Sequence, residues 1–245
     1  GFEGFEETED GLLAYIPEPE FKKEDIDALF EPFGINYTIQ TIAPKNWNEE
    51  WERNFEPVVV EGFCTVRADF HEKNADTPYD IIITPKMSFG TGHHATTRLM
   101  MQQMQDIDFK AKSVFDFGTG TGILAILSEM LGAKDVVAID NDEWAHENSK
   151  ENLQRNNTGY IEVSQGSITD IAARQFDVIL ANINRHILLE YMNHMYALLK
   201  PGGIILMSGL LTEDVQVVKP AAIEAGFTFV QTDALNNWIV LKFVR

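Results

Sequence analysis

The sequence predicts an α/β protein in which a mostly parallel, doubly wound sheet follows a small α+β segment. From residue 96 onward, strand-like runs alternate with helical stretches, and this alternation is typical of parallel strands joined by crossover helices. A glycine-rich turn connects the first of these strands to its helix. The last two runs are separated only by a turn-like segment, residues 233–237, and predict a closing antiparallel hairpin.

The predicted sheet has seven strands, each a short run rich in branched apolar residues. These are residues 114–116, 136–140, 161–164, 178–182, 204–208, 227–231 and 238–244. Shorter β runs precede them at residues 58–60, 63–66 and 81–83. A parallel sheet finished by an antiparallel strand resembles the Rossmann-like, class I methyltransferase fold, which we expect for residues 58–245.

Residues 1–42 predict a small α+β domain with strands at 12–16 and 35–39 and a helix at about 20–30. The chain begins with glycine in what reads as the middle of a strand or turn, so this domain is expected to be incomplete. Residues 43–57 predict a linker helix that starts after Asn46 and ends at Pro57.

Composition limits the possible partners and compartments. The net charge of −19 disfavours binding to a phosphate backbone, and the acidic first part of the chain could instead attract a basic partner. With no apolar run of 18 residues and an acidic start, the chain predicts neither a membrane span nor a secretory signal. The single cysteine, Cys64, is expected to be a small core residue, and a cytoplasmic protein is predicted.

The glycine-rich turn is the strongest functional motif. Gly118, Gly120 and Gly122 follow Asp116 at the end of a strand, in the spacing G-x-G-x-G. Glycines permit a tight turn and let a ligand approach the backbone at a helix N-terminus. A dinucleotide site would favour G-x-G-x-x-G, and Asp116 would repel its pyrophosphate but attract a positively charged sulfonium or amino group.

A second acid follows on the next strand. Asp140 ends the run at 136–140, where such folds present a carboxylate to ribose hydroxyls, although it could also cap the helix that starts near Asp142. After the third strand, where methyltransferases often have an acid or amide at the adenine, this sequence has Ser167.

The fourth strand ends at Asn182, which we interpret as the candidate catalytic residue. In amino-methylating enzymes this strand end faces the methyl group, and an amide there can accept hydrogen bonds from an incoming amine. The alternative is a turn residue that satisfies backbone groups. The prolines and aromatic residue that follow this position in nucleic-acid adenine methylases are missing, which disfavours a nucleobase substrate.

An upstream loop at residues 87–97 contains two glycines, two histidines and a Thr96-Thr97 pair expected to cap the next helix. No third ligand with suitable spacing accompanies His93 and His94, so no metal site is predicted.

Together these motifs resemble the ribosomal protein L11 methyltransferase family in order and spacing. The matching segments are residues 89–97, 116–122, 122–126, 181–183, 201–203 and 208–211, with the paired tryptophans of the linker. Ala95 departs from the family, because many relatives have proline there. The resemblance implies S-adenosylmethionine as cofactor, and Thr97, Gly118, Asp140 and Asn182 as its contacts, with Phe89, His94 and Thr96 lining the same pocket.

The resemblance also implies methylation of lysine ε-amino groups and the N-terminal α-amino group of L11, a basic protein of the large ribosomal subunit. It further implies that residues 1–42 are the latter part of a ferredoxin-like substrate-recognition domain. The alternatives left open are a methyltransferase of the same fold acting on a small-molecule amine, a binding module without turnover, and a nicotinamide-dependent dehydrogenase.

Overall fold

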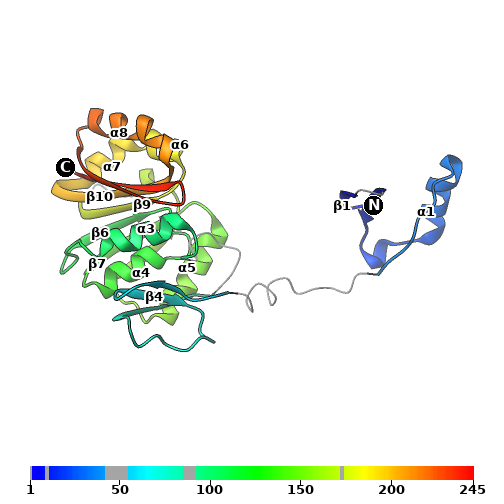
Figure 1. Cartoon of the computed structure of the whole chain (residues 1–245), viewed down its shortest axis with the longest axis horizontal. Helices are drawn as coiled ribbons and strands as arrows, with labels where there is room; N and C mark the ends of the chain where they lie inside the picture. The colour runs from blue at the N-terminus through cyan, green and yellow to red at the C-terminus, as the bar shows by residue number, and fades with distance from the viewer. Residues whose placement is uncertain (1, 9–10, 42–54, 85–91, 172–173) are drawn as a thin grey trace. The chain divides into compact units, whose positions relative to one another are not determined.

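The computed structural model describes residues 2–8, 11–41, 55–84, 92–171 and 174–245 (Figure 1). The chain divides into two compact units, Gly1–Trp47 and Asn48–Arg245. Most of the predicted linker, including Asn46 and the helix predicted to follow it, lies outside the described residues. The domain boundaries inferred from the sequence therefore remain a prediction.

The first unit contains a two-stranded hairpin and one helix. Strands β1 (Gly4–Thr8) and β2 (Gly11–Tyr15) pair antiparallel, and helix α1 is Lys23–Phe30. The strand predicted at residues 35–39 is wrong: no ladder forms there, and Ile35 and Ile39 are 50% and 52% exposed. Alternating apolar residues form a strand only where a neighbouring strand pairs with them, and none does among the described residues.

The second unit is built on a sheet with the strand order β11-β12-β10-β9-β6-β7-β8. All neighbouring pairs are parallel except those that β12 makes with β10 and β11. This confirms the predicted Rossmann-like methyltransferase sheet of seven strands. Its strands are β6 (Ser113–Phe117), β7 (Asp135–Asp140), β8 (Ile161–Gln165), β9 (Phe176–Asn182), β10 (Leu199–Leu211), β11 (Thr228–Leu235) and β12 (Trp238–Val244).

The closing hairpin turns more tightly than the sequence predicts. Strand β11 continues to Leu235, so only Asn236 and Asn237 form the turn, with φ of 49° and 65°. A two-residue hairpin turn that matches the twist of its strands requires a positive φ at both central residues. Asparagine tolerates this conformation better than most residues. Asp233, predicted in the turn, therefore belongs to the strand.

Helices cover both faces of this sheet (Figure 1). They are α3 (Ala95–Met104), α4 (Ile123–Met130), α5 (Glu143–Arg155), α6 (Arg185–Glu190), α7 (Met192–Leu198) and α8 (Val215–Glu224). Strand residues alternate between two apolar cores: Val114 and Val178 pack with α3 and α4, whereas Phe115 and Ile179 pack on the side of α6 to α8. Among the described residues, no helix is long and apolar enough to cross a membrane.

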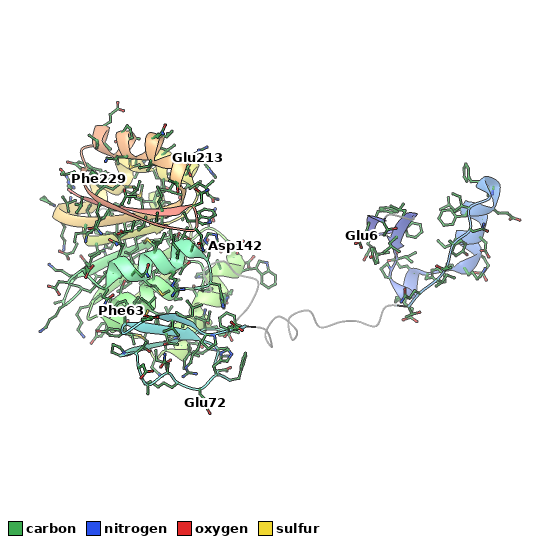
Figure 2. The ribbon with its side chains drawn as sticks, viewed as in Figure 1. Glu6, Phe63, Glu72, Asp142, Glu213 and Phe229 are labelled. Carbon is green, nitrogen blue, oxygen red and sulfur yellow. The ribbon has the colours of Figure 1, made fainter. Side chains whose placement is uncertain are left out.

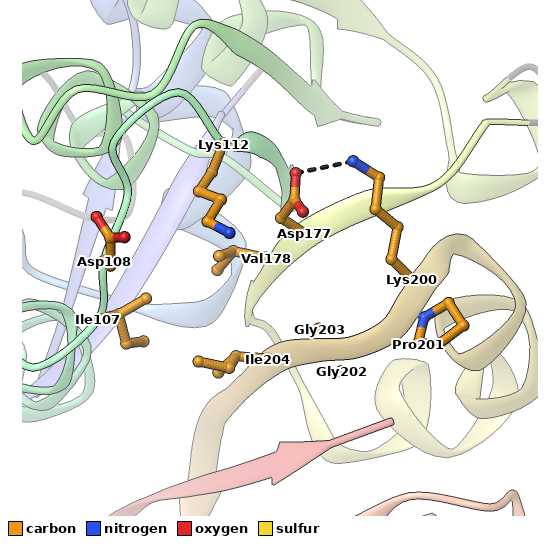
Figure 3. Close-up of a pocket in the computed structure, with 10 residues that line it drawn as sticks. All are labelled: Ile107, Asp108, Lys112, Asp177, Val178, Lys200, Pro201, Gly202, Gly203 and Ile204. Carbon is orange, nitrogen blue, oxygen red and sulfur yellow. Dashed lines mark hydrogen bonds and ion pairs between the residues drawn. The ribbon is translucent and has the colours of Figure 1, made fainter.

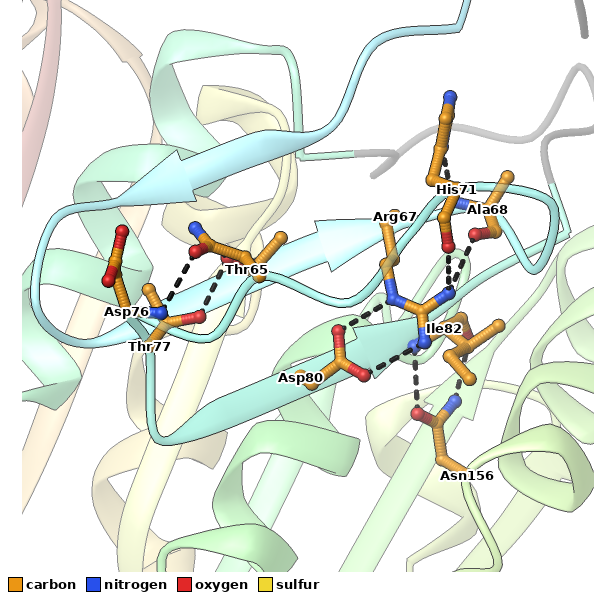
Figure 4. A network of polar contacts seen from close by, with 10 residues as sticks. Thr65, Arg67, Ala68, His71, Asp76, Thr77, Asp80, Ile82 and Asn156 are labelled. Atoms are coloured by element: carbon orange, nitrogen blue, oxygen red, sulfur yellow. Dashed lines mark hydrogen bonds and ion pairs between the residues drawn. The ribbon is translucent and has the colours of Figure 1, made fainter.

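A small sheet lies beside α4 and α5 and leads into the upstream loop. It comprises β3 (Val58–Val60), β4 (Cys64–Arg67) and β5 (Tyr79–Ile82), with β4 antiparallel to β3 and parallel to β5. Arg67 and Asp80 form a buried two-pronged ion pair at 2.8 and 3.0 Å that joins β4 to β5 (Figure 4). Cys64 is fully buried as expected, and desolvation raises its thiol pKa to about 12.

Candidate active site

The glycine-rich turn lies between β6 and α4, at the carboxyl edge of the parallel strands. Gly118, Gly120 and Gly122 have φ of 76°, 55° and 81°, a region that other residues seldom adopt. The backbone N–H groups of Gly118 and Thr119 donate to the carbonyl of Ile139 at 2.9 and 3.0 Å. These two bonds hold the turn against the end of β7.

Gly118 also touches the end of β9. A Cβ built at this position would lie 2.2 Å from Cγ2 of Ile183, far inside van der Waals contact. The ends of β6, β7 and β9 therefore meet at a residue without a side chain. The sequence motif predicts the glycine, but Ile183 as the reason for it was not foreseen.

We expect Gly118→Ala to lower the free energy of unfolding by about 1–3 kcal/mol, because it combines a positive φ with overpacking against Ile183. It should also weaken cofactor binding by shifting the turn. Urea unfolding and calorimetry would measure the two effects. Gly202→Ala is the matched control, since Gly202 also has a positive φ, of 76°, but open space at its Cβ. Equal losses in both variants would contradict a role for the Ile183 contact.

Asp116 is buried within this edge, with 1% of its surface exposed. Its Oδ2 accepts a hydrogen bond from the Thr119 hydroxyl at 2.6 Å, whereas Oδ1 has no partner among the described residues. Desolvation raises the pKa of Asp116 to about 7, with a further contribution from Asp140; Thr119 opposes the shift, as does the Ala125 amide more weakly. A buried acceptor without a donor fits a ligand that brings a positively charged or N–H group.

Asp140 lies at the end of β7 and faces the glycine turn. Its Oδ2 accepts from the backbone N–H of Gly120 at 2.8 Å, and its Oδ1 accepts from the N–H of Asp142 at 3.0 Å. The helix cap is Asp142 itself, which is labelled in Figure 2. Its side chain accepts from the N–H of Ala145 at 2.8 Å. Each carboxylate oxygen can accept a further bond, so Asp140 has capacity left for hydroxyl groups.

Asn182 ends β9 beside Gly118. Its Nδ2 donates to the Thr97 hydroxyl at 3.3 Å, and its Oδ1 is buried without a hydrogen-bond partner among the described residues. The amide is thus held on its donor side while its acceptor is left available. If Asn182 served only to hydrogen-bond the backbone of the turn, its Oδ1 would accept from a backbone N–H. The geometry therefore favours an oxygen that accepts from a ligand.

His94, and not the threonine pair, caps α3. Its Nδ1 accepts from the N–H of Thr96 at 3.4 Å and lies 2.8 Å from the Thr96 hydroxyl. Thr96 and Thr97 lie in the first helical turn and are fully buried. The His94 ring packs edge-on against Trp238, and desolvation lowers its pKa, which favours the neutral ring that a capping acceptor requires.

The structure thus links the predicted residues in one series of contacts. Asp140 accepts a hydrogen bond from Gly120, and Gly118 packs against Ile183. Asn182, which precedes Ile183, donates to Thr97, and the neighbouring Thr96 bonds with His94. Phe89 lies outside the described residues. Ser167 is engaged locally: its N–H donates to Asp170 at 2.8 Å. Sequence reasoning did not identify Trp238, which meets His94 only in three dimensions, and although Ile183 lies in the matching segment 181–183, its contact with Gly118 was not predicted.

A pocket lies at the opposite, amino edge of the parallel strands (Figure 3). Lys200 there donates to Asp177 at 2.8 Å and to the Ser113 hydroxyl at 3.0 Å. Desolvation raises the pKa of Asp177, but the hydrogen bonds from Lys200 and from the N–H and hydroxyl of Ser113 outweigh it and hold this pKa down to about 2. The charges neutralise each other, and ligands of parallel α/β sheets bind at the carboxyl ends, so the glycine turn remains the candidate site.

Similarity to known proteins decides the family. Residues 6–245 match the family model described as ribosomal protein L11 methyltransferase. The chain belongs to the ribosomal protein L11 methyltransferase family. A member from Phocaeicola vulgatus is 43% identical over 100% of this chain and 89% of its own length. Another, from Porphyromonas gingivalis, is 44% identical over 99% of this chain and 86% of its own length.

A solved structure supports the same family. The ribosomal protein L11 methylase of Lactobacillus delbrueckii subsp. bulgaricus superposes with a TM-score of 0.71 at 28% identity, covering 78% of this chain and 99% of that one. The fold is that of S-adenosylmethionine-dependent methyltransferases, which implies S-adenosylmethionine as the cofactor of this family member. Two buried acceptors at the glycine turn, Asp116 Oδ1 and Asn182 Oδ1, fit a cofactor that carries an amino group and a positively charged sulfur.

Proposed function

We propose that this protein transfers methyl groups from S-adenosylmethionine to lysine ε-amino groups and the N-terminal α-amino group of ribosomal protein L11. The observation that carries the proposal is the partnerless amide oxygen of Asn182 beside the glycine turn, among the residues that the structure describes. It is a buried acceptor at the strand end that faces the methyl group in enzymes of this fold. The names of the relatives supply the substrate protein.

Specific residues would hold the cofactor. Asp140 would accept hydrogen bonds from ribose hydroxyls, and Gly118 and Gly120 would let it approach the backbone. Asp116, once ionised, would attract its positive groups. Thr97, Thr96, His94 and Phe89 would line the same pocket. When bound, S-adenosylmethionine supplies a methyl group on a positively charged sulfur.

Asn182 would act on the incoming amine. A lysine has a pKa of about 10.4 in water and carries no lone pair when protonated, so the pocket must favour the neutral form. Burial of the amine beside a positively charged sulfur favours this neutral form. The Asn182 Oδ1 would then accept an N–H of the neutral amine and aim its lone pair, while water carries away the released proton. Because positioning accounts for most of the catalysis, no metal ion is proposed.

The described residues contain no group of three or more His, Cys, Asp or Glu side chains arranged to hold an ion. We propose that residues 1–42 contact the substrate and that the excess negative charge of the chain favours a basic protein over nucleic acid. A ribosomal substrate favours a cytoplasmic location.

The test is a methylation assay on the proposed substrate. Labelled S-adenosylmethionine and ribosomal proteins from a strain lacking the enzyme are incubated with the protein, and the labelled product is identified by mass spectrometry. We expect label on L11 at lysines and at its N-terminus. Label on a small amine only, with none on L11, would replace the proposal by a small-molecule methyltransferase. Cofactor binding without transfer to any acceptor would indicate a binding module.

A further inference from the structure

Helix α5 and the residue that follows it carry three asparagines at four-residue spacing: Asn148, Asn152 and Asn156. Residues four apart lie on one face of a helix. Asn152 is fully buried and Asn148 is 2% exposed, whereas asparagine is usually found on the surface. Buried amides need partners for several donors and acceptors, so this face is expected to bond with other segments.

Asn152 and Asn156 take the place of a neighbouring strand along one edge of β5 and the two residues that follow it. Asn156 Oδ1 accepts from the N–H of Ile82 at 2.9 Å and its Nδ2 donates to the Ile82 carbonyl at 2.6 Å (Figure 4). Asn152 Oδ1 accepts from the N–H of Thr84 at 2.8 Å. Between them, the N–H of Ile83 points the other way and donates to the Arg67 carbonyl of β4.

The spacing of the two elements matches. Four helical residues rise about 6.0 Å and two extended residues about 6.6 Å, so Asn156 and Asn152 meet alternate N–H groups of the extended chain, those of Ile82 and Thr84. Helix α5 therefore fixes the chain up to Thr84, the last residue described before the upstream loop.

Asn152 also hydrogen-bonds to a second segment of the chain, the glycine turn. Its Nδ2 donates to the backbone carbonyl of Thr121, between Gly120 and Gly122 in the glycine turn, at 2.8 Å. One buried amide thus bonds both the backbone of Thr84 and the turn of the candidate active site. Asn156 makes the same kind of bond to β5 but none to the glycine turn among the described residues.

We infer that Asn152 is a positioning residue that sets the glycine turn against the chain at Thr84 and so shapes the S-adenosylmethionine pocket. The inference rests on the proposed function. Asn152 does not act on the cofactor itself; it acts through Thr121 and Thr84. A purely structural asparagine would contribute to stability only, as Asn156 is expected to do.

The experiment compares Asn152→Ala with the matched control Asn156→Ala in the full chain. Each is characterised by thermal unfolding and by calorimetric titration with S-adenosylmethionine, and kcat and KM are measured with L11. We expect Asn152→Ala to raise the Kd and KM for S-adenosylmethionine about tenfold with little change in kcat. Asn156→Ala should lower the unfolding temperature but change Kd by less than about twofold.

A second variant, Asn152→Ser, keeps a small polar group and serves if the alanine variant does not fold. Its Kd should also exceed that of Asn156→Ala. Equal Kd values for the Asn152 and Asn156 variants, or an unchanged Kd in a folded Asn152 variant, would overturn the inference while leaving the proposed function intact. If the unaltered protein itself failed to bind S-adenosylmethionine, the proposed function would fall and the inference with it.

Discussion

Replacing Asn182 by alanine is expected to lower kcat for methyl transfer to L11 by about 100-fold, because misplacement of a reacting group by about 1 Å can cost this much. The amide oxygen is the buried acceptor at the end of β9 that has no partner among the described residues, and its loss removes the group proposed to aim the amine. Single-turnover methylation with saturating cofactor would measure the chemical step directly.

The matched control for this variant is Asn184→Ala. Asn184 follows the same strand end, but it is exposed and its side chain makes no capping hydrogen bond to α6. It should retain nearly full kcat. Calorimetry on Asn182→Ala separates its two possible roles: a large loss of kcat with only a small change in Kd assigns the amide to the amine. An unchanged kcat would remove Asn182 from the chemistry.

Asp116→Asn is expected to change stability and cofactor affinity in opposite directions above pH 7. Burial raises the pKa of Asp116 from an ordinary 3.8 to about 7 in the folded protein. Between those values the folded state holds a proton that the unfolded state has lost, so stability falls as pH rises through this window. Above pH 7 the full cost of the buried charge is present, at most about 4 kcal/mol.

The asparagine variant does not titrate, so its stability should fall less than that of the unaltered protein between pH 5 and pH 8. Urea unfolding at both pH values measures the difference, with the exposed Asp76→Asn as control. Cofactor affinity, unlike stability, should rise with pH in the unaltered protein. At pH 8 the variant should bind the cofactor about 10- to 100-fold more weakly than the unaltered protein. Equal affinities of the two proteins at pH 8 would exclude this carboxylate from cofactor binding.

The reason for this opposition is that the buried charge is unfavourable until a ligand binds. Folding buries the Asp116 carboxylate with a single side-chain hydroxyl partner among the described residues, that of Thr119. A positively charged ligand group supplies the missing interaction and draws the proton off. Parallel stability curves for the unaltered protein and the Asp116→Asn variant would show that the carboxylate is already satisfied without the ligand.

Much of the fold follows from local patterns in the chain. Branched apolar runs that alternate with helices predict the parallel sheet, and all its strands form near the expected positions. The run at residues 35–39 has the same alternation but forms no strand, because pairing depends on a neighbour that the pattern itself does not contain. The turn at Asn236 and Asn237 was placed too broadly for a related reason, since strand ends depend on cross-strand register.

Local patterns along the chain are enough to predict the glycine turn, the acids that precede it and end the next strand, and the amide at Asn182, because each is a residue type at a fixed place relative to a strand end. Three features appear only once the chain is folded. They are the buried oxygens of Asp116 and Asn182 that lack partners among the described residues, the capping of α3 by His94, and the bonds from Asn152 to Thr84 and Thr121. These contacts join segments far apart in the chain, and burial and hydrogen bonding depend on which segments meet.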